Sequence, residues 1–166
     1  NGPLAIVFSE ELTSQPKIIS CWQNSALAFI YMEKAEFTIA ESYINPLLKH
    51  LEVGTEAGQH IIIQYTHASF FFAQHRYLEA IDCLDDAWHV YQHKRDSIMF
   101  TPPSIVALKA RCLLAMSQVE KADYIINQLG SETINAVPLN YEDINLTKAR
   151  IFMEQDHSEL ALEMLK

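Results

Sequence analysis

Apolar residues along this chain recur at offsets of three and four positions, which is the spacing of side chains on one face of an α-helix. Phe71 follows Ala68 by three positions, for example, and Leu84 follows Ala80 by four. No stretch of useful length alternates between apolar and polar residues with a period of two, as a half-buried strand does. The pattern predicts an all-α protein.

Pairs of alanines organise these helical segments into a repeat. The two alanines of each pair are twelve residues apart, and the pairs recur after 40, 42 and 39 residues, at Ala28 and Ala40, Ala68 and Ala80, Ala110 and Ala122, and Ala149 and Ala161. Small residues let two antiparallel helices approach closely, so each pair predicts the crossing point of a helical hairpin. The large residues beside each crossing need a neighbouring hairpin to cover them, so the hairpins are expected to stack.

The register of the alanines divides residues 1–166 into the units of one array. We predict units at 17–53, 56–95, 101–130 and 140–166, the last one truncated, and we expect 3–15 to be the second helix of a preceding unit. Thr101 with Pro102 predicts a helix start, and Gly54 and Gly130 predict helix ends. Pro46 is expected to kink or shorten the second helix of the first unit.

Both ends of the chain resemble cuts through a longer array. Apolar stripes are expected to be bare around Phe8 and Leu12 at one end and around Leu162 and Leu165 at the other. Terminal units of natural arrays carry polar outer faces, so such stripes favour self-association through the truncated ends.

The order of small and large residues at Ala68, Phe71, Tyr77, Ala80 and Leu84 resembles that of a tetratricopeptide repeat. The common form of that repeat is about 34 residues long, whereas units of about 40 residues are similar to those of bacterial signalling regulators, including the sensor arm of the maltose-regulator type of transcription activator. The resemblance implies a right-handed α-solenoid of stacked antiparallel helix pairs.

The same resemblance implies a function. It suggests a protein–protein interaction scaffold in a larger bacterial cytoplasmic regulatory or signalling protein, which binds a peptide or protein segment in its concave groove. The alternative is a sensor domain of a transcription regulator that binds a small ligand, either a sugar or a signalling peptide. His75 and Ser117 depart from the family pattern, because the corresponding turns usually carry glycine.

Composition and charge narrow the possible partners. The net charge of −9 and the pI near 5.1 oppose direct binding of nucleic acid, which requires a surplus of Lys and Arg on one face. The longest apolar stretches, such as 61–63 and 70–73, are far shorter than the roughly 20 residues that cross a bilayer. Three scattered cysteines, without a zinc or redox spacing, favour a reducing cytoplasm.

Candidate catalytic and metal-binding residues are few. His89 and His93 have the spacing of two zinc ligands on a helix, but Val90 stands where a zinc protease carries glutamate, and no third ligand is evident. We expect His67 to be a packing residue and Cys83 to be a core thiol. The chain is therefore predicted not to be an enzyme and to bind no metal or other cofactor.

The remaining candidate site is the face that the first helix of each unit turns away from its partner helix. It holds the residues at offsets −6, −3, +1, +4 and +5 from the first alanine. Ten of these form the predicted partner-binding groove, namely Trp22, Phe29, Met32, Ile62, Tyr65, Phe72, Arg111, Leu114, Arg150 and Met153. The other residues at these offsets are Ser25, Glu33, Ser69, Ala73, Ser104, Ala107, Ala115, Asp143, Leu146 and Glu154. The alternative is that these side chains pack against neighbouring units.

Overall fold

The structure is a computed structural model that describes residues 17–53, 55–94, 102–129 and 139–165. These residues form helices joined by short turns and contain no strand, which confirms the prediction of an all-α protein. The helices are α2 (Lys17–Glu33), α3 (Phe37–Val53), α4 (Ala57–Ala73), α5 (Tyr77–Lys94), α6 (Pro102–Ala115), α7 (Val119–Asn127), α9 (Leu139–Glu154) and α10 (Ser158–Met164). The helix expected at 3–15, with Phe8 and Leu12, and the signals at Gly54, Thr101 and Gly130 lie outside the described residues.

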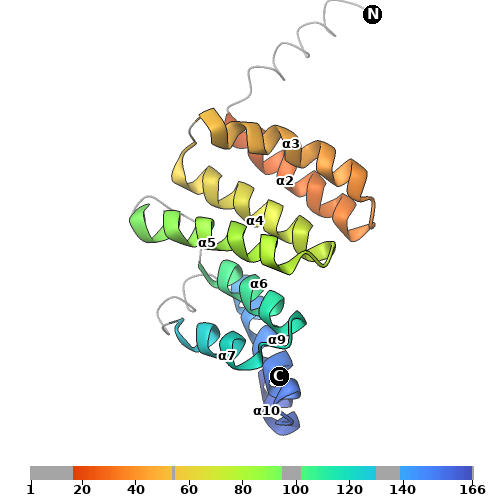
Figure 1. Cartoon of the computed structure of the whole chain (residues 1–166), viewed down its shortest axis with the longest axis vertical. Coiled ribbons are helices and arrows are strands. Elements are labelled where there is room, and N and C mark those ends of the chain that lie inside the picture. The colour runs from red at the N-terminus through yellow and green to blue at the C-terminus, as the bar shows by residue number, and fades with distance from the viewer. Residues whose placement is uncertain (1–16, 54, 95–101, 130–138, 166) are drawn as a thin grey trace, which may run out of the picture.

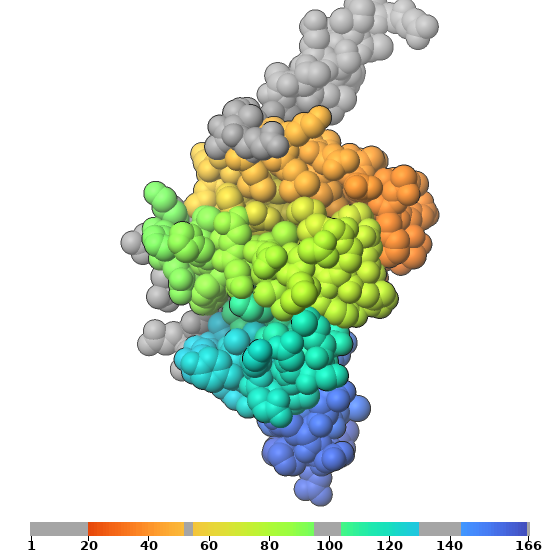
Figure 2. Space-filling model, in the orientation of Figure 1, coloured from red at the N-terminus to blue at the C-terminus, as the bar shows by residue number. Residues whose placement is uncertain are grey.

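Helices that are consecutive in the chain pack in pairs. The pairs are α2 with α3, α4 with α5, α6 with α7, and α9 with α10, and they follow one another along the length of the molecule (Figure 1). The first helix of each pair also contacts the first helix of the next pair. These contacts are extensive between α2 and α4 and between α6 and α9, but sparse between α4 and α6. Figure 2 shows the green surface of α5 across the middle of the molecule, which narrows toward the blue C-terminal pair.

All four pairs are joined by the same turn. In the first pair, the N–H of Ala35 donates to the carbonyl of Met32 and the N–H of Glu36 donates to the carbonyl of Tyr31, both at 2.9 Å. Ala35 is in the left-handed conformation, with φ of 56°. These bonds define a Schellman motif, which closes the C-terminus of a helix and reverses the chain. The same motif recurs with left-handed residues at His75, Ser117 and Asp156.

The turns keep the register of the alanines. Each left-handed residue lies seven positions after the first alanine of its unit and five before the second, as Ala28, Ala35 and Ala40 show. All eight alanines are buried, with 4% exposure or less. Ala28 and Ala40 share one core cluster, and the next two alanine pairs also each share a cluster. Each of these clusters also contains residues of the next hairpin, such as Phe70, Ile105 and Ile144, so the core continues from one hairpin to the next.

Two sequence features have different outcomes in the structure. Helix α3 continues through Pro46 to Val53, so the proline does not shorten it. Pro46 and Ser42, whose carbonyl loses its helical donor, both lie on the exposed side of α3, so the freed carbonyl is open to solvent. Leu162 and Leu165, expected to be bare, are 61% and 55% exposed; the self-association that this favours remains a prediction.

The left-handed turns provide a first test. Replacing Ala35 with glycine should stabilise the protein by about 1 kcal/mol, because glycine lacks the Cβ that opposes a positive φ. The matched control is Ala26→Gly in the exposed interior of α2, which should cost about 1 kcal/mol through lost helix propensity. Urea unfolding followed by circular dichroism would measure both. Destabilisation of similar size by the two substitutions would contradict the assigned turn.

The alanine crossings provide a second test. Ala80 has no exposed surface, so Ala80→Leu should force α4 and α5 apart and cost about 1–3 kcal/mol of folding free energy. Gln23→Leu places the same side chain on an exposed position of α2 and should change stability by less than about 0.5 kcal/mol. Equal unfolding midpoints for the two variants would show that the helices do not approach closely at Ala80.

Candidate partner-binding face

A cavity of about 290 Å³ opens between α2, α4 and α6. It brings together four residues of the predicted groove, Trp22 and Phe29 from α2 and Ile62 and Tyr65 from α4. The rest of its wall consists of Ser25, Ala26, Ile61, Thr66, Ser104 and Ile105. We call this space the apolar cavity, because most of these side chains are aliphatic or aromatic.

The packing of the first helices explains why the apolar cavity forms. Helix α4 lies against α2, where the rings of Phe29 and Tyr65 have centroids 6.1 Å apart and make one wall. Between α4 and α6 the contacts are sparse. Ser104 and Ile105, near the start of α6, complete the wall, and Ile105 is a buried residue of the core cluster that also contains Ile61 of α4.

Ser25 is the unusual polar group of this cavity. Its side chain is only 4% exposed, and its hydroxyl has no hydrogen-bond partner. Serine and threonine inside helices usually donate to the carbonyl four positions earlier, as Thr66 does to Ile62 at 2.8 Å and Ser69 does to Tyr65 at 2.9 Å. A buried polar group without a partner is uncommon, so the free Ser25 hydroxyl marks a place where an occupant can make a hydrogen bond.

A second cavity of about 400 Å³ lies at the C-terminal ends of α4, α6 and α9. Phe72, Arg111, Leu114 and Arg150 line it, as predicted residues of the groove, together with Ala115 and Glu154. The Arg111 guanidinium lies over the Phe72 ring, 4.7 Å from its centroid, which fixes the direction of the charge. We call this space the arginine cavity.

The charges of the arginine cavity are not neutralised by ion pairs. Among the described residues, neither Arg111 nor Arg150 has a carboxylate oxygen within 4.0 Å, although Glu154 lines the same cavity. Arg76, in contrast, is bound to Glu79, with Nε 2.9 Å from a carboxylate oxygen. The cavity therefore presents a net positive charge on a chain whose net charge is −9.

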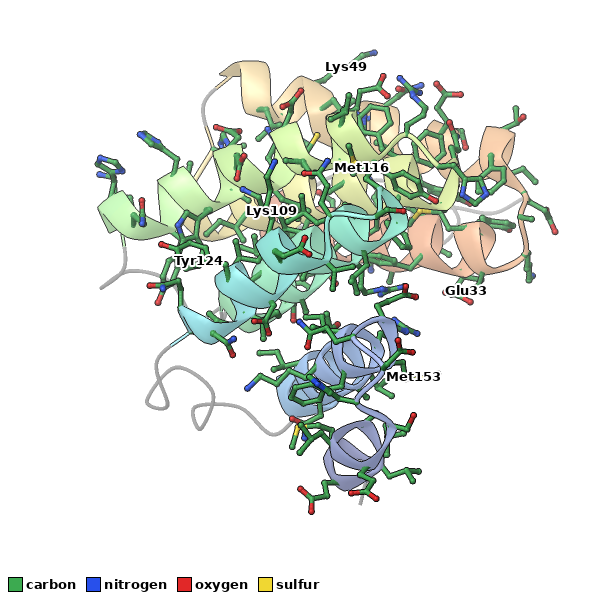
Figure 3. All side chains as sticks on the ribbon, turned by 60° about the horizontal axis from the view of Figure 1, so that its bottom comes forward. Glu33, Lys49, Lys109, Met116, Tyr124 and Met153 are labelled. Atoms are coloured by element: carbon green, nitrogen blue, oxygen red, sulfur yellow. The ribbon has the colours of Figure 1, made fainter. Side chains whose placement is uncertain are left out.

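Two residues of the predicted groove lie elsewhere. Met32 is 9% exposed and belongs to a core cluster with Ala28 and Phe70, so it is a packing residue at this point of the fold. Met153, labelled on α9 in Figure 3, is 64% exposed and lines neither cavity. The residue four positions after the first alanine therefore lines a cavity only where neighbouring helices leave an open space beside it.

The cavities also contain residues that the chosen offsets missed. These are Ala26, Ile61, Thr66 and Ile105 in the apolar cavity, each one position from a chosen offset. A wider helical stripe would have included them. Ser25, Ser104, Ala115 and Glu154 lie at chosen offsets and line the cavities, whereas the side chain of Asp143 lies outside the described residues.

A third and smaller cavity of about 160 Å³ lies on the other side of α6, against α5 and α7. Most of its wall consists of core residues such as Leu84, Val106 and Leu129. Lys109, labelled in Figure 3, pairs with Asp85 across its edge. With its charges paired in this way, this cavity is a residual space between packed helices.

The structure places Cys83 beside His67, with Sγ 3.7 Å from Nδ1, a contact that the sequence pattern did not reveal. Burial, helped by the carboxylates of Asp82 and Asp86, raises the pKa of the Cys83 thiol to about 11. Burial and then the charge of Arg76 lower the pKa of His67. Both groups are therefore neutral at pH 7, which is the opposite of an activated thiolate–imidazolium pair.

His89 and His93, which have the spacing of two zinc ligands, lie side by side near the end of α5. Their rings have centroids 4.2 Å apart, and the Nδ1 of His93 lies 2.8 Å from the carbonyl oxygen of His89. Within 17–53, 55–94, 102–129 and 139–165, no three side chains of His, Cys, Asp or Glu come together in a way that could hold a metal ion. The two histidines therefore remain an incomplete ligand set in this part of the chain.

Comparison with protein-family models, with curated proteins and with solved structures gives no match for this chain. None of the described helices has the length and apolar character needed to cross a membrane. The chemistry of the cavities is therefore the basis for a functional proposal.

The raised pKa of Cys83 can be tested by alkylation. With a pKa of about 11, the native thiol is almost wholly protonated at pH 8, so iodoacetamide should react about a hundredfold more slowly than with the unfolded chain. The rate should rise as the pH approaches 11. Asp82→Asn removes a charge that raises this pKa and should speed the reaction. Rapid labelling at pH 8 would instead indicate a reactive thiolate.

Proposed function

We propose that this chain is a protein-interaction domain that binds a segment of a partner on the face formed by α2, α4, α6 and α9. We call this surface the first-helix face, because each of these helices is the first of its pair. In this proposal the helix pairs form a right-handed α-solenoid of the tetratricopeptide type, and the domain is part of a larger bacterial cytoplasmic regulator. The domain binds its partner and catalyses no reaction.

The observation that carries the proposal is the position of the predicted groove residues. Four of them line the apolar cavity and four line the arginine cavity, and both cavities are lined only by first helices of the pairs. Buried aromatic and arginine side chains in desolvated pockets dominate the energetics of protein interfaces. A face that combines aromatic and arginine side chains with open cavities has the chemistry of a binding surface.

The second candidate is a sensor of a small ligand, and the apolar cavity is the feature that favours it. At about 290 Å³, that cavity is near the lower limit for sites that enclose a small molecule. A sugar needs many hydrogen-bonding groups, whereas this wall is mainly apolar and the Thr66 hydroxyl already binds the Ile62 carbonyl. The side chain of a partner residue suits the cavity better.

Charge supports the same choice of partner. An acidic peptide suits the two arginines of the arginine cavity, because planar guanidinium groups bind carboxylates by paired hydrogen bonds. A nucleic acid would meet a chain with 21 acidic and 12 basic residues, whose net charge repels a phosphate backbone. The proposed partner is therefore a peptide or protein segment that carries an acidic residue.

A selection from a displayed peptide library would test the proposal. Selected peptides should bind on the first-helix face, so Phe72→Ala and Arg111→Ala should each weaken binding by about 1–3 kcal/mol. Because the Arg111 guanidinium lies over the Phe72 ring, the double variant should lose less than the sum of the two single losses. Titration calorimetry would measure all three variants.

Matched controls distinguish binding from folding. The guanidinium of Arg76 lies 4.3 Å from the centroid of the Phe71 ring but lines neither cavity, so Arg76→Ala should keep full affinity. Tyr124, labelled in Figure 3, is 65% exposed on α7, and Tyr124→Ala removes an aromatic ring outside these cavities. The proposal fails if selected peptides bind the Phe72 and Arg111 variants as tightly as the parent, or if those variants unfold.

A further inference from the structure

Building on the proposed function, we propose that the bound segment is recognised at two points. A tyrosine side chain enters the apolar cavity and bonds the hydroxyl of Ser25, and a carboxylate three residues away binds Arg111 and Arg150. The segment lies along the first-helix face in the extended polyproline II conformation, which turns every third side chain to the same side. One order of the two residues along the segment is preferred.

The Ser25 hydroxyl gives the first point its specificity. It is buried, lines the apolar cavity and has no partner. An occupant with a hydroxyl at its tip supplies that partner, whereas a purely apolar occupant leaves the group buried and unsatisfied. Rings from Trp22, Phe29 and Tyr65 form much of the wall, and they favour a flat aromatic occupant. Tyrosine combines an aromatic body with a terminal hydroxyl.

The arginine cavity determines the charge at the second point. Arg111 and Arg150 contribute two positive charges and Glu154 one negative charge, so the cavity is left with one net positive charge. That balance suits a single carboxylate better than a phosphate, which carries up to two negative charges near neutral pH. The Phe72 ring holds the Arg111 guanidinium in place, which lowers the cost of ordering it on binding.

The positions along α4 and α6 determine the spacing. Tyr65 in the apolar cavity and Phe72 in the arginine cavity are seven residues apart on α4, and Ser104 and Arg111 are seven apart on α6. Seven helical residues rise by about 10 Å. An extended chain in the polyproline II conformation covers about 9 Å in three residues and brings the side chains of residues i and i+3 to the same side. The occupant is extended, because the two cavities are separate and an α-helix with side chains needs a trough about 10 Å wide throughout.

Defined peptides test this proposal. Fluorescent nonapeptides would carry tyrosine and glutamate at spacings of two, three, five and seven, in both orders, and polarisation would report binding to the whole chain. Among the peptides with tyrosine and glutamate three residues apart, the one with the preferred order should bind about tenfold more tightly than peptides with any other spacing. A peptide that binds best at a spacing of seven would overturn the extended geometry.

Substitutions on both molecules then locate each contact. Tyrosine to phenylalanine in the peptide should weaken binding to the parent protein about fivefold, but less than twofold with Ser25→Ala. Glutamate to glutamine should weaken binding to the parent protein, but not to Arg111→Ala. Glu154→Gln should strengthen binding of the acidic peptide, because it removes a negative charge that repels the carboxylate. It should leave binding of the glutamine peptide unchanged.

The outcomes separate this proposal from the proposed function. If Ser25→Ala keeps the full preference for tyrosine over phenylalanine, the hydroxyl does not contact the ligand and the two-point model is wrong. Ser25→Ala removes an unsatisfied buried group and should fold at least as well as the parent chain. If library peptides bind the first-helix face without a tyrosine and an acid at this spacing, the function stands and only the two-point model fails.

Discussion

The close approach of two helices at a pair of alanines is the constraint on which the rest of this structure depends. In each hairpin the left-handed turn residue lies seven positions after the first alanine and five positions before the second. This spacing is the same in all four hairpins. Because the alanines have no side chain beyond Cβ, the helices of a hairpin can pack closely there. The larger residues on either side then point toward neighbouring hairpins and form the core.

The same constraint explains which parts of the fold could be predicted. The helices and their register follow from the twelve-residue alanine spacing, which is a local property of the chain. The left-handed turn residues are Ala35, His75, Ser117 and Asp156, and none of them is glycine, so their backbone conformation was visible only in the structure. Of the two effects expected at Pro46, a kink or a shortening, the shortening does not occur, because the carbonyl that the proline frees lies on the exposed side of the helix.

The residues of the candidate site could also be predicted only in part. Helical offsets identify which residues of a first helix turn away from its partner, and they placed eight residues in the two cavities. They do not determine how closely two successive hairpins approach, and that distance decides whether a side chain is buried like Met32 or exposed like Met153. The free hydroxyl of Ser25 could not be predicted either, because most helical serines bond their own backbone.

One position of the repeat accounts for the different chemistry of the two cavities. The residue that follows the first alanine is Phe29, Ser69, Arg111 and Arg150 in successive units. In the first unit it packs its ring against Tyr65 of the next unit, and in the third it reaches back over Phe72 of the preceding one. The face therefore changes from aromatic to cationic along the array while the backbone geometry stays the same. Substitution at this position changes the chemistry of the face without changing the alanine crossings that hold the hairpins together.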